Sequence, residues 1–167
     1  MTASTLAHAI PPGLLLFVGA LLIPLFRGHL RSAYMLVLPV AGLLQLLLLE
    51  KGSYLGLSVL SLDLVLLRVD QLALVFGYIF HIAAFIGVIY ALHLKDTPQH
   101  VSALTYAGAA IGDVFVGDLV SLFVYWELTA ITSAFLIFAR RTPRAFHAGM
   151  RYLIIQVGSG VLLLTGI

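Results

Sequence analysis

The chain has 167 residues, of which 62% are hydrophobic and only 10% are charged, and it contains no cysteine. Its mean hydropathy is +1.12, whereas soluble domains carry about a quarter charged residues, so the composition excludes a soluble globular domain and predicts an integral membrane protein. The absence of cysteine excludes disulfides and thiol chemistry, and a net charge of +2 carried between apolar runs is typical of membrane orientation and not of nucleic-acid binding.

Six apolar segments are candidates for membrane helices, each of which needs roughly 17–25 mostly apolar residues. In chain order, we expect these helices at 13–26, 33–49, 72–94, 101–116, 119–139 and 148–167. The first extends back towards Ile10 if the prolines at 11 and 12 start it, and Pro24 is expected to kink it. The fourth is the weakest of the six because it contains Asp113. The predicted fold is an all-α integral membrane protein with a single transmembrane domain over residues 1–167.

The stretch "GSYLGLSVLSLDLVLLR" separates the second and third predicted helices. Leucines at 60, 62, 64 and 66 alternate with other residues, and a period of two is typical of a strand. Two interpretations remain open here. The stretch is either a short β-hairpin lying on the membrane surface or an irregular loop with anchoring leucines.

Basic residues are distributed unevenly between the two ends of the predicted helices. Only Lys51 and Arg68 lie on one side. The richer side holds Arg27, Arg31, Lys95, Arg140, Arg141 and Arg144. Because the side rich in Lys and Arg normally faces the cytoplasm, we expect both termini of this six-helix chain on the outer side.

Glu127 lies near the middle of the fifth apolar segment, "DLVSLFVYWELTAITSAFLIF". A carboxylate at that depth costs about 2.5–3.5 kcal/mol on insertion, and the eleven Leu, Ile, Val and Phe residues of this helix return about 0.3–0.6 kcal/mol each. Insertion is therefore feasible, but the carboxylate must face inward and find a donor, a cation or a proton. Glu127 is either a proton-exchanging group or a protonated side chain that holds two helices together.

Helical spacing separates Glu127 from the other polar residues of its helix. Ser121, Tyr125, Thr129 and Thr132 share one broad side, and Glu127 points away from most of them. Asp118 is expected to cap this helix, with a role in proton access as the alternative.

Three further polar residues are candidates for the same pathway. Arg151 either tunes the charge of Glu127 or extends to the membrane interface. His147, four residues earlier on the same face, is either a proton relay or merely solvated. His81, in the middle of the third helix, either relays protons or bridges two helices by one hydrogen bond. No spacing of metal-ligating residues, phosphate loop or nucleophilic triad is present in the sequence.

The segment "GDLVSLFVYWELTAITSAFLI" resembles the fifth-helix signature of the antiporter-like subunits of respiratory complex I, Mrp-type cation/proton antiporters and membrane-bound hydrogenases. The shared pattern is an Asp-Leu pair at 118–119, an aromatic-Glu pair at 126–127 and a serine-containing apolar tail. The segment "RRTPRAFHAGMRYLIIQVGSGVLLLTGI" resembles the following loop and sixth helix, with the basic-aromatic pair at 151–152, and "LLRVDQLALVF" resembles the start of the third helix, with Asp70 at its acidic position.

The resemblance implies a role for Glu127. In the family, the fifth-helix Glu gates proton movement together with a Lys on the seventh helix, and the subunit has about fourteen helices built around two inverted repeats. This chain would correspond to the N-terminal portion, with helices 1–3 at about 10–94 and helices 4–6, the start of the inverted repeat, at about 101–167. The Lys would then come from another membrane subunit.

Two functions follow as hypotheses. The first is a part of an ion-translocating multisubunit complex, moving protons and, as a second candidate ion, Na⁺, in a bacterial or archaeal cytoplasmic membrane. The second is a structural or assembly subunit derived from an antiporter-like protein. In either case we expect a transporter subunit or a non-redox subunit, with the lipid bilayer and other membrane subunits as partners, no nucleic acid, no cofactor and no metal.

Overall fold

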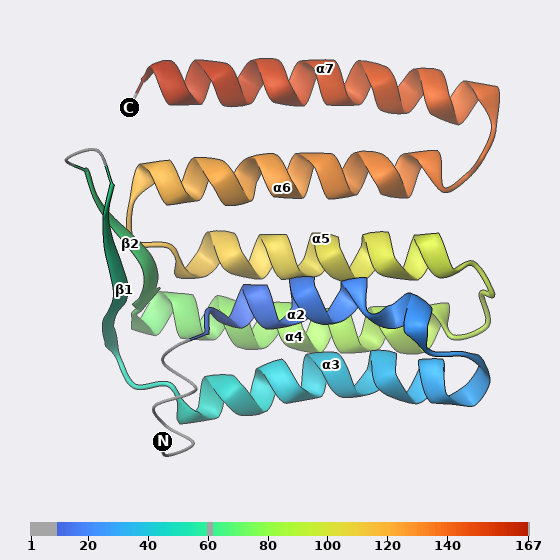
Figure 1. Ribbon diagram of the computed structural model, residues 1–167, viewed down its shortest axis with the longest axis horizontal. Helices are drawn as coiled ribbons and strands as arrows, with labels where there is room; N and C mark the ends of the chain where they lie inside the picture. The colour runs from blue at the N-terminus through green and yellow to red at the C-terminus, as the bar shows by residue number, and fades with distance from the viewer. Residues whose placement is uncertain (1–9, 60–61, 167) are drawn as a thin grey trace.

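A computed structural model describes residues 10–59 and 62–166 of the chain. In the described part, six α-helices lie side by side along one long axis, and a two-stranded sheet lies across one end of them (Figure 1). The elements in chain order are α2 (Pro12–Leu21), the short 3-10 helix η1 (Ile23–Leu25), α3 (Gly28–Leu48), β1 (Gly52–Val59), β2 (Leu62–Val69), α4 (Gln71–Ala91), α5 (Thr97–Phe115), α6 (Leu119–Phe138) and α7 (Pro143–Thr165). The predicted fold class is confirmed.

Four of the described helices, α3, α4, α6 and α7, are individually long and apolar enough to cross a membrane. The first is shorter because the α-helix ends at Leu21 and continues as η1, which contains Pro24. The predicted distortion at Pro24 is confirmed. Its physical reason is that proline has no N–H to donate to the preceding turn of an α-helix. α5 carries more polar residues and lies in the middle of the bundle, between α4 and α6. The protein is an integral membrane protein.

Three helices begin four or five residues before the apolar run that predicted them. α3 begins at Gly28, α5 at Thr97 and α7 at Pro143. Prolines occupy the first turns of α5 and α7, where a backbone N–H has no partner inside the helix. Thr142 also caps α7 by accepting a hydrogen bond from the backbone N–H of Ala145 at 3.1 Å. Hydropathy alone misses these polar first turns.

The hairpin interpretation of the segment between the second and third predicted helices is confirmed. β1 and β2 pair antiparallel, with Ser53 opposite Arg68 and Ser58 opposite Asp63, while residues 60–61 lie outside the described part. The hairpin is fastened to the short connection between α5 and α6. The N–H of Gly117 donates to the carbonyl of Val65 at 2.8 Å, and the Val65 N–H donates to Asp118 Oδ2, also at 2.8 Å.

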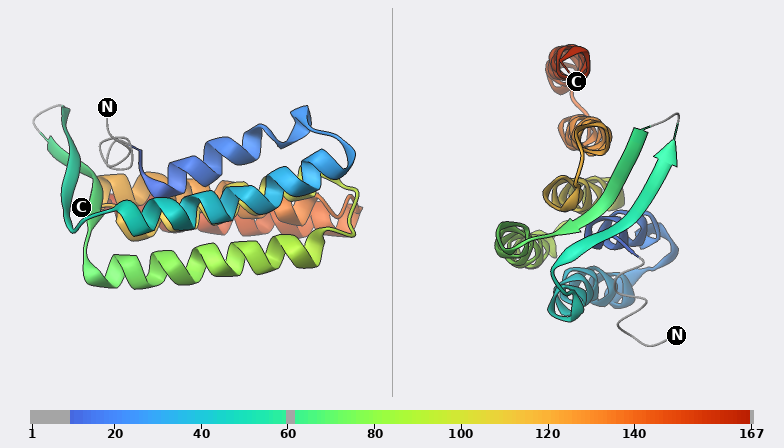
Figure 2. Two further views of the ribbon diagram at one scale, coloured as in Figure 1. Left: turned by 90° about the horizontal axis from the view of Figure 1, so that it is seen from below. Right: turned by 90° about the vertical axis from the view of Figure 1, so that its left-hand side faces the viewer.

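The helices form a cluster of four, α2 to α5, with α6 and then α7 extending from it in a row (Figure 2). Two apolar cores fill the cluster. One lies nearer the hairpin, around Leu16, Leu67 and Phe115, and the other lies towards the opposite end, around Ile23 and Met35. In the described part of the chain, α7 packs against α6 alone. α6 therefore lies between the four-helix cluster and α7.

Candidate functional site

The start of α6 is fixed by its cap. Asp118 Oδ1 accepts a hydrogen bond from the backbone N–H of Ser121 at 2.8 Å, so the predicted capping role is confirmed. Asp118 Oδ2 is the oxygen that binds Val65 of the hairpin. The two bonds together set the position of the helix that carries Glu127.

Glu127 is half-buried, and its side chain points towards α7. The residue opposite is Gly160, which is buried. A Cβ added at Gly160 would overlap Glu127 Oε1 and would lie only 2.8 Å from Glu127 Cδ. The carboxyl group therefore occupies space that exists because residue 160 has no side chain.

Glu127 Oε1 is enclosed, and it has no hydrogen-bond partner among the described residues. The nearest aromatic neighbour at this contact is Phe123, one turn earlier on α6. An ionised carboxylate in such surroundings is unfavourable without a donor or a cation, because its hydration is lost. Proton exchange at Glu127 stays a prediction.

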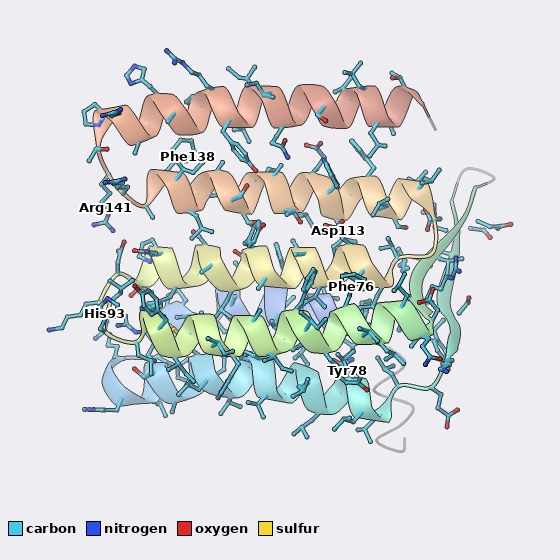
Figure 3. The ribbon with its side chains drawn as sticks, turned by 180° about the vertical axis from the view of Figure 1, so that it is seen from behind. Phe76, Tyr78, His93, Asp113, Phe138 and Arg141 are labelled. Atoms are coloured by element: carbon cyan, nitrogen blue, oxygen red, sulfur yellow. The ribbon has the colours of Figure 1, made fainter. Side chains whose placement is uncertain are left out.

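The rest of the α6–α7 contact is mostly apolar. Ser133 Oγ donates to the hydroxyl of Tyr152 at 2.8 Å, which is a hydrogen bond between the two helices. Further along, the ring of Phe138 packs against Gly149 (Figure 3). Glu127 takes part in neither the Ser133–Tyr152 contact nor the Phe138–Gly149 contact.

Arg151 and His147 lie on α7 but apart from Glu127. Arg151 is exposed and precedes Gly160 by nine residues, which is about 13.5 Å along a helix. His147 is also exposed, and its Nδ1 is 2.7 Å from the carbonyl oxygen of Pro143. In the described residues, the structure brings neither side chain to the carboxylate, so their roles stay predictions.

His81 occupies a different interface, between α3 and α4. It is 1% exposed, and its Nδ1 is 2.7 Å from the carbonyl oxygen of Gly77. The imidazole lies against Gly42 of α3, and Nε2 has no partner in the described part. The hydrogen bond stays within α4, so the structure shows neither a hydrogen-bonded bridge to α3 nor a relay, and both stay predictions. Within residues 10–59 and 62–166, no three metal-ligating side chains gather to hold an ion.

Asp113 makes a contact with α6 that the sequence analysis did not predict. It lies in the last turn of α5, and Thr129 Oγ1 of α6 lies 3.1 Å from its Oδ2 (Figure 3). The polar side of α6 predicted from helical spacing therefore faces α5 at this level, since Tyr125 also packs there, against Gly112. The polar side of α6 could have indicated from the sequence that a polar residue of a neighbouring helix packs against it.

Comparison with known proteins gives relatives but no match to a family model. The chain is 29% identical over 170 residues to the Na⁺/H⁺ antiporter subunit A1 of Staphylococcus aureus strain JH9, and the match covers 89% of this chain. The same protein of strain Newman matches equally well. The chain is similar in sequence to this antiporter subunit. The resemblance to antiporter-like subunits noted from the sequence is confirmed.

The chain spans about a fifth of the length of these curated relatives, since the match covers 21% of each. Its fold is similar to that of one chain in the solved structure of the membrane-bound sulfane sulfur reductase, an archaeal respiratory membrane complex. The TM-score is 0.73 at 18% identity, covering 98% of this chain and 36% of the other. This likeness extends through all six helices and concerns the fold alone.

Proposed function

We propose that the chain is part of a multisubunit complex that moves ions across a bacterial or archaeal cytoplasmic membrane. Its contribution is Glu127, which takes up and releases a proton on the ion pathway. The sequence similarity to an antiporter subunit and the membrane helices support the first part. The observation that carries the second is the enclosed, unpartnered Oε1 of Glu127 opposite Gly160, within the described residues.

In this proposal Glu127 alternates between a protonated and an ionised state. With a proton bound, the neutral carboxyl group is compatible with the apolar α6–α7 contact. When a cation or a hydrated path comes close, the ionised form is stabilised and the proton leaves. A Lys on another membrane subunit, as in the family that the sequence resembles, would be such a cation, and protons or Na⁺ would be the transported ions.

The same resemblance gives the chain a place in a longer architecture. Residues from about 10 to 94 correspond to the first three helices of an antiporter-like subunit, and those from about 101 to 167 to the start of its inverted repeat. Both termini lie on the outer side in this proposal.

A second candidate is a structural or assembly subunit without a transport role of its own. The observation that favours it is the close fit between Glu127 and Gly160, because a permanently protonated Glu can serve packing alone. The two candidates differ in one requirement. Transport needs a group that exchanges its proton, whereas packing needs only its shape and hydrogen-bonding capacity.

The substitution Glu127→Gln separates these functions, because Gln keeps the size and hydrogen bonding of a protonated Glu but has no exchangeable acid proton. In the assembled complex, we expect Glu127→Gln to abolish or strongly slow ion-gradient dissipation in vesicles, normalised to intact complex. Glu127→Asp should retain a fraction of the rate, because the acid remains but is withdrawn by one methylene. Wild-type rates in the Gln variant would assign Glu127 to packing.

A further inference from the structure

The only hydrogen-bond partner of Asp113 among the described residues is the hydroxyl of Thr129. Thr129 Oγ1 lies 3.1 Å from Asp113 Oδ2 and 2.9 Å from the backbone carbonyl oxygen of Tyr125. Both oxygens are acceptors if Asp113 is ionised, yet a threonine hydroxyl has a single hydrogen to donate. The single hydrogen would then be shared between two acceptors, as it is at Thr132, whereas a proton on Asp113 would give each contact a hydrogen of its own.

A proton on Asp113 completes the chain of hydrogen bonds. The Asp113 O–H donates to Thr129 Oγ1, and the Thr129 O–H donates to the Tyr125 carbonyl. The other oxygen, Asp113 Oδ1, is enclosed and has no partner among the described residues, which disfavours a negative charge further.

An open depression in the surface at the hairpin end of the bundle, called the cavity below, has Asp113 in its lining. It has a volume of about 250 Å³, room for several water molecules at about 30 Å³ each. Its lining consists of Asp113, Val116, Gly117, Asp118, Leu119 and Leu122. Water at the end of the bundle can therefore reach the level of Asp113.

The two carboxyl groups of this cavity are in opposite situations. Burial tends to raise the pKa of Asp118, but hydrogen bonds from Ser121 and from the backbone N–H of Val65 and Val120 hold that pKa below its ordinary value. Asp118 is therefore the ionised group at the cavity. Asp113 has only the Thr129 hydroxyl, so the deeper of the two groups is the one that holds a proton.

The elements around α5 offer no positive charge to offset an ionised Asp113. α2 and η1 contain no titratable residue, and α6 contributes the phenol of Tyr125. On β2, Arg68 packs beside Gly117 but forms its ion pair with Asp70 at 3.7 Å. His81 of α4 is held by its own helix through Gly77. No ion pair to Asp113 exists within the described residues.

We propose that Asp113 is a second proton-exchanging site, protonated at rest through its hydrogen bond to Thr129 and loaded from the hairpin end of the bundle. The step is a simple transfer, in which a hydrated proton in the cavity binds a carboxylate oxygen of Asp113 and water is released. The role in transport rests on the function proposed above, whereas the protonation of Asp113 does not.

The protonation state is tested by infrared spectroscopy on the assembled complex at neutral pH. We expect a carbonyl stretching band of a protonated carboxylic acid that is lost in Asp113→Asn and retained in Glu127→Gln. Thr129→Val should shift this band because the acceptor is removed. Thr132→Val is the matched control, since the Thr132 hydroxyl bonds only carbonyls of its own helix. An identical spectrum for wild type and Asp113→Asn would overturn the proposal.

Transport distinguishes this inference from the function on which it rests. Asn mimics a protonated Asp at Thr129, so Asp113→Asn should assemble and melt like the wild type while ion-gradient dissipation falls at least about tenfold, as for other proton-transfer groups. Wild-type transport in Asp113→Asn beside an inactive Glu127→Gln would refute a transport role for Asp113 and leave the proposed function intact. Wild-type transport in Glu127→Gln would refute the proposed function itself.

Discussion

Two glycines of α7 provide a matched test of the contact around Glu127. Gly160 and Gly158 are two residues apart on one helix, so they point to nearly opposite sides. A Cβ at Gly160 would lie 2.8 Å from Glu127 Cδ and 3.4 Å from Phe123 Cε2, whereas a Cβ at Gly158 would have open space around it. Gly160→Ala therefore displaces the carboxyl group, and Gly158→Ala leaves it in place.

The size of the effect follows from these distances. Carbon atoms in contact prefer about 3.5–4.0 Å, so Glu127 Cδ, at 2.8 Å from the new Cβ, must retreat by about 0.7 Å or more. Overpacking costs about 1–3 kcal/mol, and replacing Gly by Ala in a helix returns up to about 1 kcal/mol. We expect Gly160→Ala to be destabilised by about 0–3 kcal/mol and Gly158→Ala to be neutral or stabilised by up to about 1 kcal/mol.

The assay combines thermal unfolding of the complex in detergent with ion-gradient dissipation in vesicles. We expect roughly tenfold slower transport in Gly160→Ala, because displacements near 1 Å at a reacting group can cost about a hundredfold, and wild-type transport in Gly158→Ala. Equal transport rates for the two variants would refute the assignment of the α6–α7 contact as the place where Glu127 works.

Two further predictions concern the α5–α6 connection and the orientation of the chain. Asp118→Ala should destabilise the protein by about 1 kcal/mol through loss of the cap, measured as a lower melting temperature. Folding lowers the pKa of Asp118, so ionised Asp118 contributes fully to the free energy of unfolding above its ordinary pKa of 3.8. This contribution is lost as pH falls through the lower pKa of the folded state. The difference in melting temperature between the wild type and Asp118→Ala should therefore vanish in acid. A cysteine at Thr142, in a chain without cysteines, should react with a membrane-impermeant reagent from the cytoplasmic side. Labelling only from the outside would reverse the predicted orientation.

The sequence predicted the elements well because each leaves a local signature. Hydrophobic runs predicted six helices, a period of two made a hairpin one of two open interpretations, and Pro24 predicted a kink in the first helix. Three predicted helix starts lay four or five residues too late, because a polar first turn precedes the apolar segment. These helices begin at Gly28, Thr97 and Pro143.

The surroundings of the candidate site depended on which helices pack together. Helical spacing showed that Glu127 points away from the polar side of α6, but no local pattern identified Gly160 of α7 as its neighbour. Asp113 was expected within the fourth helix, and its contact with Thr129 depends on how far α5 and α6 overlap along their axes. Such information arises only when two helices are placed against each other.

The position of α6 between α5 and α7 has a mechanical consequence. Glu127 and Thr129 are two residues apart, so their side chains leave the axis about 200° apart. A turn of α6 about its own axis that carries Glu127 out of the space at Gly160 must also sweep Thr129 sideways past Asp113. One small rotation of α6 would thus break the Glu127–Gly160 contact and the Thr129–Asp113 contact together. The two carboxyl groups would then be coupled mechanically through α6.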